Sequence, residues 1–241
     1  MVVKSIKKKE PSKKDKVYLQ LKNDIITHQL RAGQPITEEE IVNKYSISRT
    51  PVREILRKLE NDGLVKNIPY KGTYISTLRR EDIEEILDIR YALEGYAAKC
   101  AAERLREHDA KTLTELEKQL VTAARTKNSV LSFECDTKLH ELILNISGNN
   151  RIHSIISNLL GQIHRIRFIS GHIEGRIDSV VNEHLEIIKA IKKRDPALAE
   201  EKMHIHIVNT KRLLLKPSTM EEQLLSILSN SKSAEKVSHE A

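Results

Sequence analysis

The chain has 241 residues, of which 39% are hydrophobic and 3% aromatic, and it carries a net charge of +7. This length allows one large domain or two ordinary ones, each with its own core. The two cysteines, Cys100 and Cys135, form no CxxC pair, which excludes a disulfide framework and indicates a reducing, cytoplasmic setting. No apolar run approaches the roughly 20 residues of a membrane span, so neither a signal peptide nor a membrane partner is expected.

Positive charge is concentrated at one end of the chain. Residues 1–76 contain 16 Lys and Arg against 9 Asp and Glu, whereas residues 77–241 contain 25 of each sign. A basic segment joined to a neutral one indicates that only the first part meets a polyanion. Taken alone, this pattern is as typical of a basic tail as of a nucleic-acid-binding domain.

Composition and periodicity divide the chain into five segments. A Lys-rich, disordered basic tail is predicted over residues 1–15, followed by a compact domain over 16–76 with helical periods and then strand signals. A linker over 77–81 leads into a helical domain over 82–216 that has almost no strand signal, and a largely disordered tail is predicted over 217–241. The fold class is therefore mainly α.

Two short helices are predicted at the start of the compact domain. The first is indicated by the helical spacing of Tyr18, Leu21 and Ile25, and it ends before Gly33. The segment Thr37-Glu-Glu-Glu40 has the form of a capping box, in which hydroxyl and carboxylate satisfy each other's backbone amides, and it begins the second helix.

A third helix follows after a tight turn. Ser48 or Thr50 can cap it, and it runs to Asp62 and stops at Gly63, a residue type that favours the left-handed end of a helix. Two short strands are predicted next, over 64–68 and 73–76, joined by a basic tip.

The third helix carries an apolar stripe on one face and a row of arginines, the arginine flank, beside it. Arg49, Arg53 and Arg57 fall together beside the stripe, and arginine suits bidentate contact with guanine. Any one of these features alone is more typical of a solvated surface. Capping box, turn, arginine flank and basic hairpin, in this order, indicate a winged helix-turn-helix.

The run from Ile47 to Val65, ISRTPVREILRKLENDGLV, resembles the GntR family of transcription regulators. The resemblance implies contacts with operator DNA from the helix and from a wing tip in or near the minor groove: Ser48, Arg49, Thr50, Arg53, Lys71 and Gly72. Many members carry an arginine where this chain has Glu38 and Glu39, so the half-site sequence stays open.

Six or seven helices are predicted in the second domain, and glycines and an Asp-Pro pair separate several of them. The predicted ranges are 82–106, 110–125, 129–146, 149–170, 176–193 and 196–215. Such a set forms an antiparallel bundle, whose interior is a natural place for a ligand or a metal.

Several polar residues interrupt the apolar faces of these helices. Asp136 and His140 are one helical turn apart, His184 lies in an apolar stripe, and His206 lies on the last helix. Three imidazoles and a carboxylate suit a divalent transition metal such as Zn, Mn, Fe or Ni. From spacing alone the signal is weak, because a lone histidine on an apolar face is more often a satisfied core residue. His204 is the alternative to His206.

The segments 89–94, 136–140 and 183–184, together with His206, resemble the FCD domain of the FadR branch of the GntR family. The resemblance implies metal ligation by Asp136, His140, His184 and His206, and a small carboxylate effector that meets a nearby arginine. Three residues are candidates for effector binding: Arg90 first, then Arg165 and Asn209. Arg90 could equally form a salt bridge with Glu94, one turn later.

Together, these observations predict a cytoplasmic homodimer that reads a palindromic operator in double-stranded DNA. We expect a repressor controlled by its effector, and not an enzyme. A metal-dependent enzyme is the alternative from another class, but Leu144 stands where the HExxH motif begun by His140-Glu141 needs its second histidine. A third possibility is a sensor whose effector is the metal itself.

Overall fold

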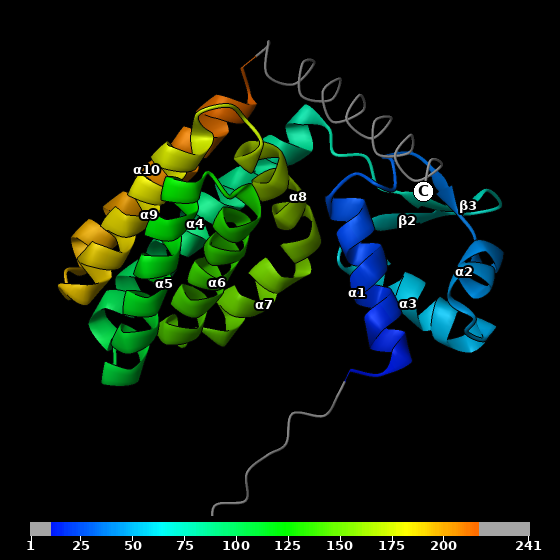
Figure 1. Cartoon of the computed structure of the whole chain (residues 1–241), viewed down its shortest axis with the longest axis horizontal. Helices are drawn as coiled ribbons and strands as arrows, with labels where there is room; N and C mark the ends of the chain where they lie inside the picture. The colour runs from blue at the N-terminus through cyan, green and yellow to red at the C-terminus, as the bar shows by residue number, and fades with distance from the viewer. Residues whose placement is uncertain (1–10, 217–241) are drawn as a thin grey trace, which may run out of the picture. The chain divides into compact units, whose positions relative to one another are not determined.

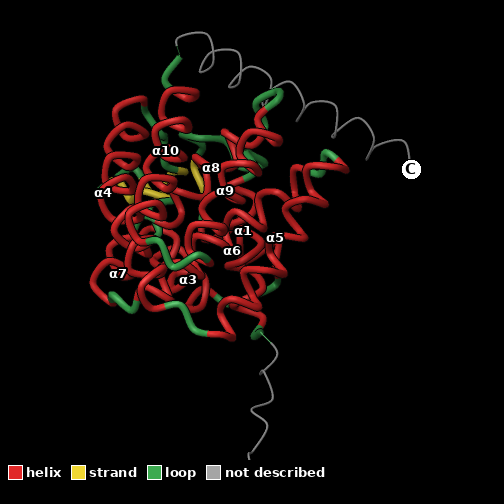
Figure 2. The backbone as a smooth tube through the Cα atoms, turned by 90° about the vertical axis from the view of Figure 1, so that its left-hand side faces the viewer, coloured by secondary structure: helices red, strands yellow, loops and turns green. Residues whose placement is uncertain are grey.

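The computed structural model describes residues 11–216 (Figure 1). It divides into two compact units, residues 1–77 and 78–241, close to the predicted boundary. Helices dominate the part of the chain that is described, and the short strands belong to one small sheet (Figure 2). The tails predicted to be disordered, 1–15 and 217–241, lie outside the described residues except for residues 11–15.

The first unit is a three-helix domain with a small antiparallel sheet. Its elements are α1 (Lys13–Ile26), β1 (Pro35–Ile36), α2 (Glu38–Tyr45), α3 (Arg49–Asn61), β2 (Val65–Ile68) and β3 (Gly72–Ile75). The sheet order is β1-β3-β2, with Asn67 opposite Thr73 in the hairpin. The hairpin is the predicted wing, whereas β1 was not predicted because two residues are too few to show an alternating pattern.

Helix α1 begins at Lys13, so the prediction of a disordered tail is wrong for residues 13–15. The cause is a capping box: the Asp15 amide donates to Ser12 Oγ, and the Ser12 amide donates to the Asp15 carboxylate, each at 3.2 Å. Satisfying these two end amides extends the helix into the Lys-rich segment.

The helix-turn-helix is held by local bonds and one apolar stripe. The capping box predicted at Thr37 is confirmed, since the Thr37 amide donates to Glu40 at 2.8 Å and the Glu40 amide donates to Thr37 at 3.2 Å. Ser46, with φ of 50°, makes the turn, and Ser48 takes the N-cap position of α3 without a side-chain capping bond. Helix α3 buries four residues against the domain: Val52, Ile55, Leu56 and Leu59.

The second unit consists of helices only. They are α4 (Arg80–Arg104), α5 (Glu107–Thr126), α6 (Ser129–Ser147), α7 (Asn150–Asn158), α8 (Leu160–Gly171), α9 (Arg176–Lys192) and α10 (Pro196–Leu214). Helix α4 packs against α6, α9 and α10, and α5 packs against α6 and α9. Together these helices enclose a core made of aliphatic side chains.

Two predicted boundaries in this unit are wrong. The predicted linker 77–81 is shorter, because Asp82 accepts from the Arg79 amide at 2.9 Å and so starts α4 at Arg80. The single helix predicted over 149–170 is broken at Leu159, whose amide bonds to Ile156, three residues back. Gly161 lies two residues after this break, but the apolar period continues through it, so periodicity alone predicts one helix.

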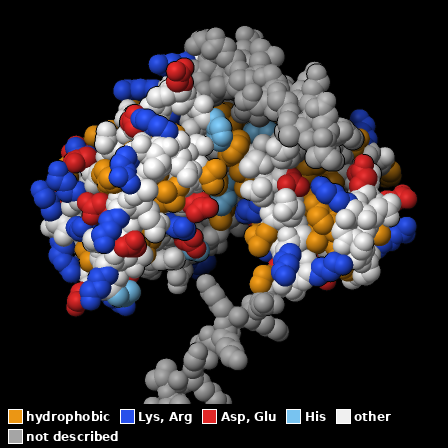
Figure 3. All heavy atoms as spheres, in the orientation of Figure 1, with side chains coloured by type: hydrophobic (Ala, Val, Ile, Leu, Met, Phe, Trp, Pro, Cys, Tyr) orange, Lys and Arg blue, Asp and Glu red, His pale blue; other side chains and the backbone are white. Residues whose placement is uncertain are grey.

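Charged side chains of both signs are interspersed over the visible face of the helical unit (Figure 3). This agrees with the balanced charge of residues 77–241. Among residues 11–216, no helix combines the length and the apolar character that crossing a membrane would require.

Candidate functional site

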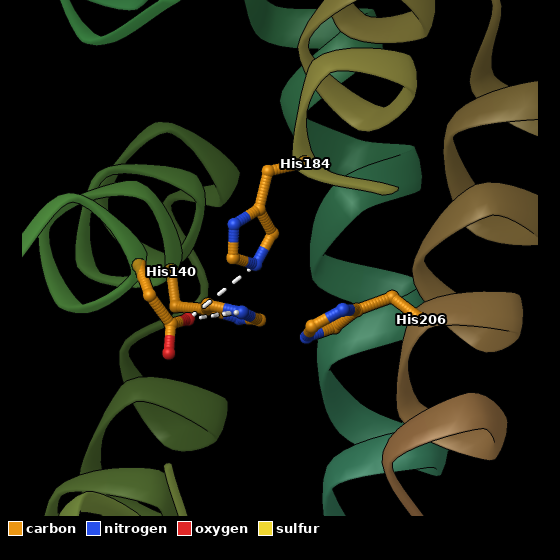
Figure 4. A group of neighbouring side chains, drawn as sticks. His140, His184 and His206 are labelled. Carbon is orange, nitrogen blue, oxygen red and sulfur yellow. Dashed lines mark ion pairs between the residues drawn. The ribbon is translucent and has the colours of Figure 1, made fainter. Parts of the chain in front are cut away.

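Four side chains from three helices converge inside the second unit. Asp136 and His140 come from α6, His184 from α9 and His206 from α10, and the three imidazole rings face one another (Figure 4). Asp136 Oδ1 lies 3.1 Å from His140 Nε2 and 3.5 Å from His184 Nε2. One ligand atom of each residue lies within 4.8 Å of the others. We call these four residues the inner cluster.

The inner cluster is buried but incompletely hydrogen-bonded. His184 is 0% exposed, and the most exposed member, Asp136, is only 8% exposed. Asp136 Oδ1, His140 Nε2 and both ring nitrogens of His184 make no well-aligned hydrogen bond among the described residues, although Asp136 Oδ1 lies within ion-pair distance of both imidazoles. Because buried polar atoms are nearly always paired, a set of unpaired donors and acceptors aimed at one point fits a bound cation.

The protonation states also fit a cation. Burial, followed by the nearby His206, holds the pKa of His184 well below its usual value, and burial lowers the pKa of His206 to about 4. Burial opposes ionisation of Asp136, but Arg167 and the neighbouring imidazoles outweigh it and hold its pKa well below normal. At neutral pH Asp136 therefore offers a carboxylate, and His184 and His206 offer imidazole lone pairs, the forms that bind metal.

A second layer of carboxylates holds two of the rings. His140 Nδ1 lies 2.5 Å from Glu94 Oε2, and His206 Nδ1 lies 2.8 Å from Glu183 Oε2. A carboxylate at Nδ1 fixes each ring and turns Nε2 toward the centre, as is usual for metal-binding histidines. Neither role was predicted from the sequence, although Glu94 and Glu183 lie within the segments that carry the FCD resemblance.

Buried arginines hold these carboxylates in turn. Arg90 donates to Glu94 through Nε at 2.8 Å, and Arg176 donates to both oxygens of Glu183 at 2.8 Å. Hydrogen bonds from His206 and Arg176 outweigh the effect of burial and lower the pKa of Glu183 to about 2. Burial also opposes ionisation of Glu94, but Arg90 and His140 outweigh it and hold the pKa of Glu94 well below normal, so both second-layer carboxylates are ionised.

A small cavity of about 30 Å³ adjoins the inner cluster. Its lining includes four hydroxyl groups (Ser129, Ser132, Ser170 and Thr210), two phenylalanines (Phe133 and Phe168) and three arginines (Arg90, Arg167 and Arg176). Arg90 and Arg176 already have full carboxylate partners. Arg167 has only a longer contact, 3.5 Å from its Nε to Asp136 Oδ2, and burial lowers its pKa.

The structure separates the three predicted effector residues. Arg90 lines the cavity, but it makes the salt bridge with Glu94 that was the alternative interpretation. Arg165 is buried outside the cavity lining, and Asn209, which does not line the cavity either, donates to Glu183 at 3.0 Å. Arg167 lies beside the inner cluster instead. It was not predicted, because the periodicity of α8 does not distinguish its face from that of Arg165.

His204 is not part of the inner cluster. Its ring stacks on Tyr91, with centroids 3.9 Å apart and planes 12° apart, and it packs over Gly95. The preference for His206 over His204 therefore agrees with the geometry.

The residues predicted to contact DNA form an exposed surface on the first unit. Ser48, Arg49, Thr50 and Arg53 are exposed at the start of α3, and Lys71 and Gly72 are exposed at the tip of the β2–β3 hairpin. Arg53 alone among them has an acidic partner in the described structure, Glu38 at 2.8 Å. Tyr70, a fully exposed residue at φ of 64°, also lies at this tip and was not predicted.

Two family models match the chain. Residues 13–75 match the gntR family of bacterial regulatory proteins, and residues 85–209 match the FCD domain. The chain belongs to the GntR family and carries an FCD domain. This FCD-type GntR regulator is thus a DNA-binding transcriptional regulator rather than an enzyme, and the predicted family and fold class are confirmed.

Curated relatives cover most of this GntR regulator. It is 31% identical over 196 residues to the uncharacterized HTH-type transcriptional regulator YdhC of Bacillus subtilis (strain 168), covering 78% of this chain and 85% of YdhC. It is 29% identical over 191 residues to the HTH-type transcriptional repressor RspR of Escherichia coli (strain K12), covering 79% and 84%.

A solved structure supports the fold. E. coli McbR/YncC superposes with a TM-score of 0.72 at 19% identity, covering 85% of this chain and 97% of that chain. At this identity the likeness concerns the fold alone.

Proposed function

We propose that this regulator holds a divalent transition metal in the inner cluster and that a small carboxylate bound in the adjoining cavity controls its affinity for operator DNA. The observation that carries the proposal is the convergence of buried ligand atoms of Asp136, His140, His184 and His206 within 4.8 Å of one another, several of them without a well-aligned hydrogen bond. Zn, Mn, Fe and Ni all suit three imidazoles and a carboxylate. A bound ion would supply a concentrated positive charge and open positions for an oxygen anion.

The carboxylate would be anchored by Arg167. Its guanidinium is buried and lines the cavity, and its one ion pair among the described residues is the 3.5 Å contact with Asp136. Because Asp136 would also bind the metal, its carboxylate would be shared between the metal and Arg167. A buried cation without a full partner favours an anionic ligand. Thr210 already donates to the His206 carbonyl and accepts from Arg176. The hydroxyl groups of Ser129, Ser132 and Ser170, however, favour a ligand with a hydroxyl group of its own, such as a short hydroxy acid.

The remaining residues would keep this arrangement in place. Glu94 and Glu183 fix the rings of His140 and His206, and their arginine partners keep both carboxylates ionised. Because the inner cluster joins α6, α9 and α10, ligand binding there can change how these helices pack. Linkage requires that DNA then change ligand affinity by the same factor.

On the DNA side, we propose a cytoplasmic homodimer that binds a palindromic operator and represses transcription. The exposed arginines at the start of α3 and the basic hairpin tip support the contact surface. Symmetric operators match two-fold protein dimers. Repression is supported by the names of two relatives, RspR and a probable D-xylose utilization operon transcriptional repressor of Paenarthrobacter nicotinovorans.

The test combines metal analysis with operator binding. We expect the purified full chain to retain close to one metal per chain, and a panel of short hydroxy acids to change its affinity for an operator selected from random duplex DNA. A metal-free protein that cannot be loaded, or an operator affinity unaffected by every acid, would contradict the proposal. If the metal alone changes the affinity, the regulator is a metal sensor instead.

A further inference from the structure

Arg53 of α3 is held by a residue of the preceding helix. Its Nε donates to Glu38 Oε1 at 2.8 Å, which joins the first turn of α2 to the first turns of α3. The Arg53 side chain is 69% exposed, so the rest of its guanidinium faces solvent. Among residues 11–216, the neighbouring Arg49 and Arg57 make no ion pair. One arginine of the flank is therefore oriented while the other two are not.

We propose that Glu38 is a positioning residue for operator recognition: by holding Nε of Arg53, it presents the two terminal amino groups of that arginine to a base edge. The proposal rests on the proposed role of Arg53 in DNA binding. A guanidinium is a rigid, planar fork, so fixing Nε also fixes the direction of both amino groups. That remaining edge is the one that can donate two parallel bonds to guanine O6 and N7.

The same ion pair reduces the attraction of Arg53 for phosphate. An unpaired arginine neutralises backbone phosphates regardless of sequence, and this attraction dominates non-specific binding. With Glu38 beside it, Arg53 gains little from a lone phosphate but still gains from a base edge that accepts both bonds. Glu38 thus exchanges some general affinity for sequence discrimination.

The two glutamates next to Glu38 separate this role from a general effect of negative charge. Glu40 is engaged in the capping box with Thr37, so its loss would disturb α2. Glu39 is exposed in the same turn and carries the same charge, so Glu39→Gln is the matched control for Glu38→Gln. A second control is Glu54→Gln, which removes an exposed ion pair between Lys14 and α3.

The experiment measures binding of the full chain to a duplex selected from random DNA by the native protein, and to every single-base-pair variant of that duplex. Arg53→Ala first identifies the base pair at which Arg53 discriminates. At that base pair, we expect Glu38→Gln to reduce discrimination roughly two- to tenfold, the cost of ordering one long side chain. Glu38→Gln and its control Glu39→Gln should both bind non-specific DNA more tightly, with a steeper salt dependence for Glu38→Gln because Arg53 is released.

Two results would overturn the inference in distinguishable ways. If Arg53→Ala alters discrimination at one base pair but Glu38→Gln behaves like Glu39→Gln there, Glu38 has no positioning role, and the proposed DNA surface stands. If Arg53→Ala alters discrimination nowhere, both the inference and the proposed role of Arg53 fail. The double variant Glu38→Gln/Arg53→Ala should match Arg53→Ala at that base pair, and circular dichroism checks that each variant is folded.

Discussion

The two units of this regulator use the same charged residue types in opposite surroundings. The arginines of α3 are exposed and mostly unpaired, whereas Arg90, Arg167 and Arg176 are buried among carboxylates and imidazoles. An exposed charge costs little free energy without a partner. Its lack of a partner therefore indicates no ligand, and its role is inferred from the sequence motif that contains it. A buried charge is costly unless it is compensated, so each unpaired atom inside the bundle points to a missing partner.

Removing one inner-cluster imidazole should abolish metal binding altogether. We expect His184→Ala to lose the bound metal and with it the added stability, about 2.7 kcal/mol when free metal is a hundredfold above Kd. Elemental analysis and thermal unfolding with and without metal measure both effects. His204→Ala is the control, because His204 lies outside the cluster. Full metal content in His184→Ala would contradict the ligand assignment.

Acidification should destabilise the metal-free protein through the bundle. His206 has a folded-state pKa of about 4, below its ordinary value, so the unfolded chain binds a proton first as the pH falls. Stability is then lost between about pH 6.5 and pH 4, by up to about 3 kcal/mol. Urea unfolding in the presence of a chelator tests this, and a flat profile over that range would argue against neutral, buried imidazoles.

The contrast between a buried arginine of α8 and an exposed one of α10 gives the next prediction. Arg167→Gln should weaken binding of a short hydroxy acid by about 2 kcal/mol, the value of a charge-assisted hydrogen bond. Calorimetry on the metal-loaded protein measures it. Arg212→Gln, which removes an exposed charge from α10, should leave the affinity unchanged. Equal losses in the two variants would mean that only the overall charge matters.

The smallest expected effect is on the stability of the first unit. Thr37→Ala removes the capping box of α2 and should destabilise this unit by about 1 kcal/mol. Thr112→Ala is the control, since that hydroxyl bonds only to the carbonyl one turn back in α5. Thermal unfolding compares them, and an unchanged midpoint for Thr37→Ala would show that the cap contributes nothing measurable.

Local patterns account for what the sequence could predict. The capping box at Thr37 and the pair Asp136 and His140 depend on residues within one helical turn, so periodicity and motif resemblance locate them. The structure brings all four predicted ligands together. The role of Arg167 was missed because it depends on which face of α8 turns toward α6, and that is decided by packing between helices. The break at Leu159 was missed because the apolar period continues past it, although Gly161 follows two residues later.

The central claim is that a ligand in the buried site changes operator affinity at the exposed surface. The most direct test is an anisotropy titration of the selected operator with metal-loaded protein, with and without the hydroxy acid that binds best. We predict a change in operator Kd of about fivefold or more in the native chain, and none in His184→Ala. The same Kd with and without the acid in the native chain would contradict the claim.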